Sequence, residues 1–325
     1  VRFPVGLTVP HMGWNQVDQQ RPHPMLAGVP DHAFTYFAHS YHAVTFETSL
    51  VVATTDYGGP FPSALARDNV WAIQFHPWSR YVIVYPAIDL RRGRCVRLVQ
   101  GDPRAETVFS DDPAATAQRW VEQGAEWLHV VNLDGAFGDA TAGANLAALR
   151  AILDAVSIPV QLGGGLRALP DIEAALALGV ERAIIGTAAL EQPTLIQEAV
   201  RRFGASAIAV AIDARDGRVA PRGWQTLSDV AALDLAQQVR DAGVERVIYT
   251  DISRDGMLSG VNAAACAQLA QATGLRVIAS GGVGTLADVE QVKAVEAAGV
   301  DGIIIGRALY TGQIDLRAAL SRARA

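Results

Sequence analysis

From residue 82 onward, the chain alternates between short apolar runs and longer segments of helical periodicity. The runs are rich in Val, Ile and Ala, as buried parallel strands are, and the longer segments repeat their apolar residues every three or four positions. We predict strands at eight runs: Val82–Asp89, Trp127–Asp134, Ile158–Gly163, Arg182–Gly186, Ala207–Asp213, Arg246–Asp251, Arg276–Ser280 and Gly302–Gly306. Helices are predicted between them, for example at Pro113–Gln123, Leu169–Leu178, Val230–Ala242 and Ala287–Ala298. Glycines that suit a left-handed helix cap follow several helical segments: Gly124, Gly179, Gly243, Gly274 and Gly299.

Eight βα units in roughly 245 residues predict a (β/α)8 barrel, and a doubly wound open sheet is the alternative. The region is also internally repeated, because three motifs of its first half recur in the second half at offsets of 124, 117 and 120 residues. The pairs are Pro86–Asp89 with Val210–Asp213, Gly163–Leu166 with Ser280–Val283, and Ile184–Leu190 with Ile304–Leu309. Each offset is close to half the barrel, so we predict a duplicated half-barrel.

The repeats place two aspartates and two groups of glycines at the mouth of the predicted barrel. Asp89 and Asp213 end the first and fifth strands, which stand opposite each other, and barrel enzymes carry their active sites at these carboxyl ends. Glycines there let backbone N–H groups approach an anion closely, and the N-terminus of the following helix adds a favourable dipole. The two groups are Gly164, Gly165 and Gly186 on one side and Gly281, Gly282 and Gly306 on the other. This arrangement predicts a ligand with two phosphates whose reactive centre lies near both carboxylates.

Composition narrows the class of protein. The 325 residues are 50% hydrophobic and 18% charged, with a formal net charge of −6. No basic block points to nucleic acid, no apolar stretch approaches the roughly 18 residues of a membrane helix, and no signal peptide is recognised. Cys95 and Cys266 have no partners at metal-ligand spacing, so we expect structural roles for both in a reducing cytoplasm. His129 is interpreted as a packed core or supporting residue.

Several motifs of the barrel region together resemble one enzyme family. They are Tyr85–Leu90, Val96–Asp102, Gly163–Arg167, Arg222–Trp224, Thr250–Gly256, Ala279–Val283 and Gly306–Tyr310. With these motifs, residues 82–325 resemble the phosphoribosylformimino-aminoimidazole-carboxamide ribotide isomerases of histidine biosynthesis. One position departs from the family pattern, since Asn132 stands where the family usually has Asp.

The resemblance implies an Amadori rearrangement, in which an aminoaldose becomes an aminoketose without cofactor or metal. By the family pattern Asp89 is the proton acceptor, Asp213 is the proton donor, and Thr250 supports them near the reacting sugar. Trp224 is expected to stack on an aromatic base. The remaining substrate and phosphate contacts implied are Arg97, Arg167, Thr187, Asp255 and Arg307, together with the two groups of glycines.

Two alternative activities stay open. The cyclase subunit of imidazole glycerol phosphate synthase has a similar duplicated barrel, but it usually carries Cys-Leu-Asp in its first strand and Lys at the position of Arg97. Here Ala87-Ile88-Asp89 and Arg97 favour the isomerase. A dual-specificity isomerase that also acts on phosphoribosylanthranilate shares Arg97 and Arg222–Trp224, so the sequence does not separate it from the leading interpretation.

Residues 1–80 differ from the rest of the chain, since they lack its alternating strand and helix pattern and hold six of the seven histidines. Its motifs resemble the C-terminal part of the glutaminase subunit of imidazole glycerol phosphate synthase, a class I amidotransferase: Pro10–Asn15, Tyr36–Tyr41, Tyr57–Gly58 and Gln74–Pro77. That family uses a Cys-His-Glu triad. His76 matches its histidine, but Trp78 replaces the glutamate and no cysteine precedes Cys95, so we expect His76 to be an inactive relic.

The join at Ser79-Arg80 lacks a flexible linker. We interpret residues 1–80 as a truncated amidotransferase-like piece joined in frame to the barrel, or as the result of a partial gene model. A piece of a domain without its partner strands is expected to fold poorly alone. The second interpretation is a weak docking module for the cyclase subunit, and a third is that the whole chain is a non-catalytic sugar-phosphate-binding barrel.

Overall fold

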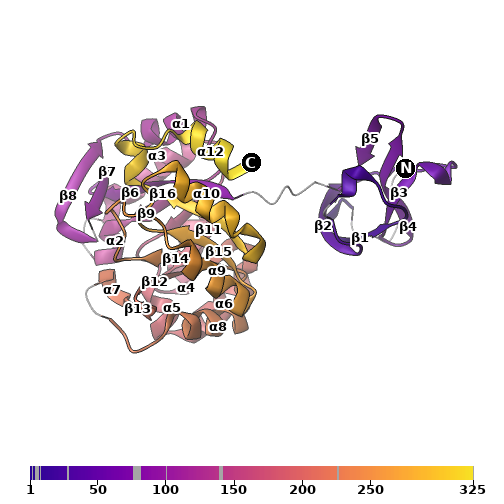
Figure 1. Ribbon diagram of the computed structural model, residues 1–325. Helices are drawn as coiled ribbons and strands as arrows, with labels where there is room; N and C mark the ends of the chain where they lie inside the picture. Colours follow the sequence, from indigo (N-terminus) through magenta and orange to yellow (C-terminus); the bar gives the residue numbers. More distant parts are fainter. Residues whose placement is uncertain are drawn as a thin grey trace. The chain divides into compact units, whose positions relative to one another are not determined.

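The computed structural model describes the chain except for residues 2, 4–6, 8, 28, 76–81, 100, 139–141, 225–226 and 325. It divides into two compact units, Val1–Ser79 and Arg80–Ala325 (Figure 1). The second unit contains the repeated βα pattern, and the first contains no α-helix among its described residues.

Eight parallel strands of the second unit close into a barrel. They are β6 (Ile83–Arg91), β9 (Leu128–Asn132), β10 (Val160–Gly163), β11 (Arg182–Ile185), β12 (Ile208–Arg215), β14 (Arg246–Asp251), β15 (Arg276–Ser280) and β16 (Val300–Ile305). Each strand pairs with the next in chain order, and the last strand pairs back onto β6, from Gly302 opposite Ile83 to Ile305 opposite Pro86. The eight predicted runs and the closed (β/α)8 fold are therefore confirmed, and the open sheet is excluded.

Helices surround this barrel (Figure 1). They are α1 (Pro113–Glu122), α2 (Leu133–Phe137), α3 (Ala142–Ala155), α4 (Leu169–Ala177), α5 (Thr187–Glu191), α6 (Pro193–Phe203), α7 (Pro221–Trp224), α8 (Ala232–Asp241), α9 (Ala263–Thr273), α10 (Leu286–Ala294), α11 (Arg307–Tyr310) and α12 (Leu316–Arg324). The helix expected at Ala287–Ala298 is shorter than predicted, because its last turn tightens into a separate 3-10 segment, Glu296–Ala298. All five glycines predicted to cap helices have positive φ, between 74° and 110°.

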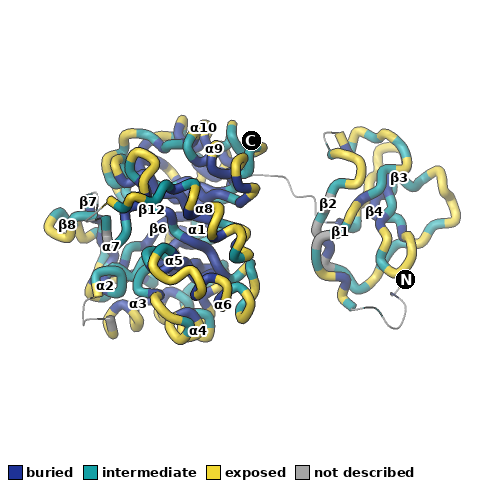
Figure 2. The backbone as a smooth tube through the Cα atoms, turned by 90° about the horizontal axis from the view of Figure 1, so that it is seen from below, coloured by how far each residue is buried: buried dark blue, intermediate teal, exposed yellow. Residues whose placement is uncertain are grey.

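The barrel unit has two hydrophobic layers. The larger one lies between the strands and the helices, and a smaller one fills the barrel interior with seven side chains: Tyr85, Ala87, Ile184, Ala209, Ile248, Ile278 and Ile304. Figure 2 shows the strands buried and the exposed residues on the outer helices and loops. Burial on both faces explains why the strands read as continuous apolar runs rather than as alternating ones.

Two hairpins extend opposite strands of the barrel in the same way. After β6 the chain turns through Arg92 and Gly93 into β7 (Arg94–Val99) and then β8 (Asp102–Ser110), and after β12 it turns through Asp216 and Gly217 into β13 (Arg218–Val219). All four turn residues have φ between 51° and 78°, as a type I′ turn requires. The prediction that Asp89 and Asp213 end their strands is thus wrong by two residues, because each strand continues into its hairpin.

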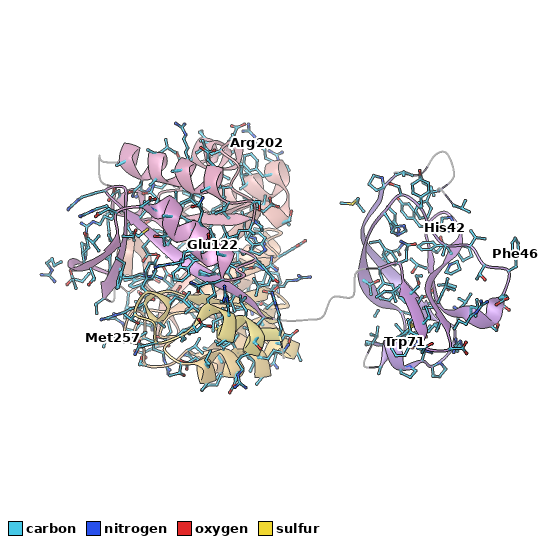
Figure 3. All side chains as sticks on the ribbon, turned by 90° about the horizontal axis from the view of Figure 1, so that it is seen from above. His42, Phe46, Trp71, Glu122, Arg202 and Met257 are labelled. Carbon is cyan, nitrogen blue, oxygen red and sulfur yellow. The ribbon has the colours of Figure 1, made fainter. Side chains whose placement is uncertain are left out.

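The first unit is a five-stranded antiparallel sheet in the order β2-β1-β3-β4-β5. The strands are β1 (His11–Gln19), β2 (Ala33–His39), β3 (Val51–Asp56), β4 (Pro60–Arg67) and β5 (Val70–Ile73). It encloses a cluster of buried residues that includes Val17, Phe37 and Phe61, and whether it folds poorly alone stays a prediction. The edge strand β5 is exposed along its whole length and carries Trp71. The Phe46 side chain is also exposed on the surface of the first unit (Figure 3).

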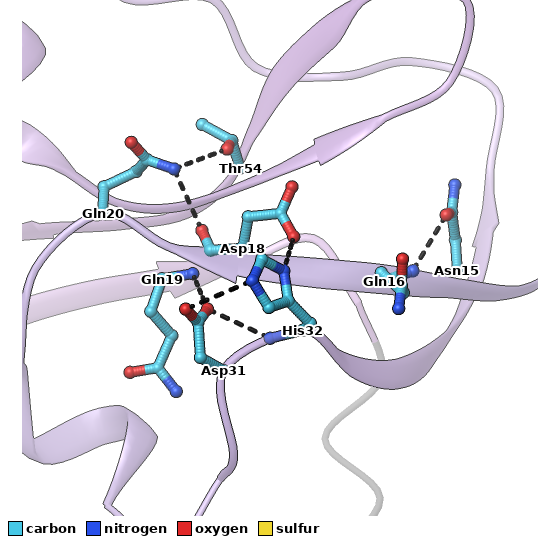
Figure 4. Close-up of polar contacts among 8 residues, drawn as sticks. All are labelled: Asn15, Gln16, Asp18, Gln19, Gln20, Asp31, His32 and Thr54. Atoms are coloured by element: carbon cyan, nitrogen blue, oxygen red, sulfur yellow. Dashed lines mark hydrogen bonds and ion pairs between the residues drawn. The ribbon is translucent and has the colours of Figure 1, made fainter.

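Polar contacts fix the end of β1 to its neighbours (Figure 4). The Gln19 backbone N–H donates to Asp31 Oδ1 at 2.8 Å, and His32 lies between Asp31 and Asp18. The Asp18 and His32 side chains form the closer of these pairs, at 2.7 Å. All three side chains are largely solvent-exposed, so these ion pairs position the 31–32 turn and contribute little stability. In the described part of the whole chain, no helix has both the length and the apolar character needed to cross a membrane.

Candidate active site

A cavity of about 820 Å³ opens at the carboxyl ends of the barrel strands. Its lining includes both predicted carboxylates, Asp89 and Asp213, and the supporting residues Thr250 and Asp255. The strands that carry the two carboxylates, β6 and β12, are separated by three strands in either direction around the ring. The expected opposition of the two aspartates across one mouth is therefore present in the fold.

Asp89 forms an ion pair at the cavity wall. Arg97, from β7, donates from Nη1 to Asp89 Oδ2 at 2.5 Å, and both side chains are more than four-fifths buried. The guanidinium also lies 5.8 Å from the centre of the Tyr310 ring. Burial lowers the pKa of Arg97, but the charges of Asp89, Tyr310 and Asp255 and the hydrogen bond to Asp89 together raise it above its usual value. Arg97, predicted as a substrate contact, is in this structure first of all the partner of Asp89.

Asp213 has a different environment. The Trp224 indole Nε1–H donates to its Oδ2 at 2.9 Å, and the Thr250 hydroxyl also bonds to the carboxyl group. Register places Thr250 beside Asp213 on the neighbouring strand. Burial raises the pKa of Asp213 in spite of both hydrogen bonds, which favours its protonated form.

Trp224 is held in an unusual backbone conformation. Its φ is +67°, which is strained for a bulky residue, and its ring packs so closely on Gly101 that a Cβ at that glycine would lie 2.6 Å from Trp224 Cε3. The stacking on an aromatic base that the sequence predicted stays a prediction, and the structure adds a direct bond from the indole to Asp213.

Asp255 is the third carboxyl group of the cavity. Its pKa is raised to about 6, mainly by burial and in smaller part by the carboxylates of Asp89 and Asp213, while the charge of Arg97 opposes the rise. The unfolded chain has a pKa near 3.8 at this residue. Between these two values the unfolded state gives up its proton and the folded state retains it, so the free energy of unfolding falls as the pH rises from about 4 to about 6.

We therefore expect Asp255→Asn to stabilise the barrel at pH 8, by about 1–3 kcal/mol, because it removes a carboxylate that is costly to ionise in the folded state. At pH 4 the two proteins are expected to be nearly equal in stability. The measurement is urea unfolding at both pH values, with the exposed Asp154→Asn on α3 as the control. A destabilised variant at pH 8 would contradict the burial cost assigned to Asp255.

The two groups of glycines have nearly identical backbones in both halves of the barrel. Gly164 and Gly165 have φ of +92° and +85°, and Gly281 and Gly282 have +90° and +85°. A Cβ at Gly281 would lie 2.6 Å from the Asp251 carbonyl oxygen, so backbone passes directly over this turn. All four glycines line the cavity, as do Gly186, Thr187, Gly306 and Arg307.

The backbone N–H groups just before α4 and α10 already donate hydrogen bonds to side chains. Asp171 Oδ2 accepts from the Arg167 and Ala168 backbones at 2.9 Å each, and Asp288 Oδ2 accepts from the backbones of Gly284 and Thr285. The N–H groups that precede α4 and α10 are therefore bonded to side chains of their own helices, whereas α5 and α11, which begin directly after Gly186 and Gly306, have no side-chain cap. That a helix N-terminus assists a bound phosphate stays a prediction.

Other predicted residues lie as follows. The Arg167 guanidinium donates to the carbonyls of Gly135 and Ala136, and that of Arg307 donates to the carbonyl of Gly256. Asn132 caps α2 by accepting from the Gly135 N–H, so the amide at this position has a structural role. His76 lies outside the described residues. Among the described residues, no group of three or more His, Cys, Asp or Glu side chains is arranged to hold a metal ion.

Comparison with known proteins decides the family. Residues 83–315 match the histidine biosynthesis protein family. The chain belongs to this family. A similar protein is the 1-(5-phosphoribosyl)-5-((5-phosphoribosylamino)methylideneamino) imidazole-4-carboxamide isomerase of Trichlorobacter lovleyi, 54% identical over 239 residues that make up 74% of this chain and 96% of that protein. The protein of the same name from Methylobacterium nodulans is 55% identical over 243 residues, 75% of this chain and 95% of that protein.

The sequence prediction assigned no role to Tyr310, which in this histidine biosynthesis barrel bonds to the strand that carries Asp89. It ends α11, and its hydroxyl donates to the carbonyl of Ala87 at 3.1 Å, two residues before Asp89. Burial raises its pKa, so it stays a neutral donor. The sequence signal was its place in the Gly306–Tyr310 motif, but only the fold brings that motif next to β6.

Proposed function

We propose that the barrel converts the phosphoribosylformimino aminoaldose of aminoimidazole carboxamide ribotide into the corresponding phosphoribulosylformimino aminoketose, a step of L-histidine biosynthesis. The observation that carries this proposal is a pair of carboxyl groups on opposite strands, in unlike environments, at one cavity. The isomerases of this name from Trichlorobacter lovleyi and Methylobacterium nodulans support the substrate assignment.

The different environments of Asp213 and Asp89 match the two proton transfers of an aldose–ketose isomerisation. Burial favours the protonated form of Asp213, and in this proposal its carboxyl group donates the proton to the ribose ring oxygen as the ring opens. Asp89, an anion paired with Arg97, then removes the proton from C2, which leaves an enol that tautomerises to the ketose. Asp89 then delivers its proton to C1, and Asp213 regains a proton as the C2 hydroxyl becomes the ketone, so both carboxyl groups return to their starting states and no electrons are exchanged with a cofactor.

The proposed substrate carries two phosphates, and the duplicated half-barrels offer two similar groups of glycines to bind them. We infer that one binds at Gly164, Gly165, Gly186 and Thr187, and the other at Gly281, Gly282, Gly306 and Arg307. Arg167 and Asp255 contact the substrate between them, and Trp224 contacts its aromatic base. The support is the location of all these residues on one cavity lining.

The test is turnover by the purified full chain. We expect conversion of the aminoaldose, and its absence would overturn the proposal. Phosphoribosylanthranilate in a parallel assay decides whether the enzyme is dual-specific. Formation of imidazole glycerol phosphate from the aminoketose and ammonia would identify a cyclase instead.

For residues 1–80, we propose an amidotransferase-like segment that supplies no nucleophile of its own for glutamine hydrolysis. The support is that residues 1–80 contain no cysteine, because thioester formation needs a thiolate. Glutamine with the full chain, alone or with a cyclase subunit, is expected to release no ammonia above background. Weak docking to that cyclase is the remaining candidate role, with the exposed Phe46 and Trp71 as a contact surface. Co-sedimentation with and without Trp71→Ser tests it.

We further propose that residues 82–325 form a complete isomerase domain. Deleting residues 1–80 is expected to leave kcat/KM within about twofold, because every cavity-lining residue and all eight barrel strands lie in the second unit. The measurements are kcat/KM and the thermal midpoint of the two proteins. A loss of more than about tenfold, or roughly 1.4 kcal/mol, would show that the first unit contributes to the site.

A further inference from the structure

A row of three polar side chains crosses the interior of the first half-barrel. His129 on β9, Gln161 on β10 and Arg182 on β11 occupy directly paired positions of neighbouring strands, so their side chains share one face of the sheet. All three are buried, and they lie at the level of Ala87, one interior position below Asp89. His129 alone of the three lines the cavity.

The hydrogen bonds along this row run in one direction only. A guanidinium has no acceptor, so Arg182 Nη1 donates to Gln161 Oε1, at 2.9 Å. The amide oxygen is thereby assigned, and Gln161 Nε2 must be the atom that faces His129 Nδ1, at 3.0 Å. Because Nε2 of an amide only donates, Nδ1 of the imidazole has to accept, and the ring proton has to sit on Nε2.

Arg182 is itself held in place. Its guanidinium lies over the Trp127 ring, 4.4 Å from the ring centre, and its Nε donates to the Ser206 carbonyl. The start of the row is therefore a fixed cation, and rotation of the Gln161 amide would turn its NH2 group toward that cation. Among the described residues, the His129 ring makes no other hydrogen bond than the one to Gln161, which leaves Nε2–H available to a ligand.

The second half-barrel demonstrates that this polar row is not needed for packing. By the internal repeat, the equivalents of the three residues are Ile248, Ile278 and Gly302, which pair with one another in the same register. The two isoleucines belong to the hydrophobic interior of the barrel. The fold thus accepts apolar side chains in this row, while the first half buries an imidazole, an amide and a guanidinium, so the polar row requires a reason other than stability.

We propose that His129 is a fixed, neutral hydrogen-bond donor to the oxygen of the reacting aminosugar, and that Gln161 and Arg182 are positioning residues that fix its tautomer. The proposal rests on the isomerase function proposed above and names a further residue for that reaction. A donor beside Asp89 holds the C2 oxygen of the sugar in the orientation from which Asp89 removes the C2 proton.

The electrostatic setting agrees with this role. Burial, together with the positive charge of Arg97, lowers the pKa of His129 to about 3. The ring is therefore uncharged at neutral pH and does not compete with Asp213 as an acid. A neutral imidazole also leaves the ion pair of Asp89 with Arg97 undisturbed.

The first test needs no substrate. In the full chain labelled with ¹⁵N-histidine, a long-range proton–nitrogen correlation spectrum identifies which ring nitrogen carries the proton, and the spectrum of His129→Gln assigns the signals. We expect a single neutral tautomer with the proton on Nε2 from pH 6 to pH 8. A proton on Nδ1, a tautomer mixture or a cationic ring would overturn the proposal.

The second test moves the proton. In Gln161→Glu both carboxylate oxygens only accept, so the ring proton of His129 is expected to move from Nε2 to Nδ1. Without the donor at Nε2, kcat is expected to fall roughly 100-fold, with KM changed less than about threefold. Gln238→Glu, at an exposed position of α8, is the matched control and is expected to change neither. Unchanged kcat in a Gln161→Glu protein whose tautomer has moved would overturn the donor role.

The third test asks for rescue. His129→Gln retains an N–H donor near the position of Nε2, whereas His129→Ile copies Ile248 of the other half and has none. We expect kcat of His129→Gln to exceed that of His129→Ile by about tenfold or more, and equal values would overturn the proposal. A wild-type protein that has the Nε2–H tautomer but no isomerase turnover would support the fixing of the tautomer by Gln161 and Arg182, and would overturn the proposed function instead.

Discussion

Asp213→Asn is expected to lower kcat by at least about 100-fold, because an amide cannot donate the proton that opens the ribose ring. The substitution is nearly isosteric, and the amide oxygen can still accept the bond from Trp224 Nε1. Asp89→Asn is expected to lower kcat by a similar factor, because an amide cannot remove the C2 proton. KM is expected to change far less in both proteins, since the phosphates supply most of the binding. The measurements are kcat and KM for the aminoaldose.

The two variants differ in their expected stability, which provides an internal check. Asp89→Asn leaves the buried guanidinium of Arg97 without its ion pair, so the protein is expected to unfold at lower urea concentration. Asp213→Asn removes a carboxyl group that is costly to ionise, and it is expected to be at least as stable as wild type at pH 8. Asp154→Asn serves again as the exposed control. Near-normal turnover in either active-site variant would contradict its assigned role.

Gly281→Ala is expected to have a large effect on stability. The substitution places a side chain at φ of +90° and brings its Cβ to 2.6 Å from the Asp251 carbonyl oxygen, which belongs to the backbone and cannot move independently. We expect a loss of about 3–5 kcal/mol in the free energy of unfolding, measured in urea, because the turn or β14 must shift. The affinity for inorganic phosphate is expected to fall together with stability.

Gly274→Ala is the matched control for this prediction. Gly274 has φ of +74° at the end of α9, but a Cβ there would meet no atom within 4 Å. It is therefore expected to cost only about 1–2 kcal/mol, the penalty of the left-handed conformation alone. Equal costs in the two variants would show that the backbone over Gly281 yields easily, and would weaken the assignment of this turn as a rigid phosphate site.

The elements of the barrel could be predicted because each depends on local pattern. Strands such as Arg276–Ser280 are buried on both faces and therefore read as apolar runs, and the glycine after each helix marks a left-handed cap. The extensions beyond Asp89 and Asp213 were missed, since the turns at Arg92-Gly93 and Asp216-Gly217 interrupt the βα alternation that the prediction followed.

The composition of the site was predictable, but its contacts were not. The internal repeat identified the two aspartates and the paired glycines, because both halves retain them. The bond from Trp224 to Asp213 depends on where the end of α7 places the indole ring, which no local pattern encodes. Polar residues such as Gln161 stand out in an apolar strand, but only strand register shows which side chains lie beside them.

The near-identical glycine turns have a consequence for the direction in which a substrate enters. The two proposed phosphate sites have glycine turns with matching backbone angles, so the turns on their own would accept a bisphosphate in either of two reversed orientations. We expect the side chains that differ between the halves to make the choice: Arg307 stands where the other half has Thr187, and the Asp89–Arg97 ion pair faces Asp213 with its bound indole. The repeated turns would then provide affinity, and the unrepeated side chains would set the direction of binding.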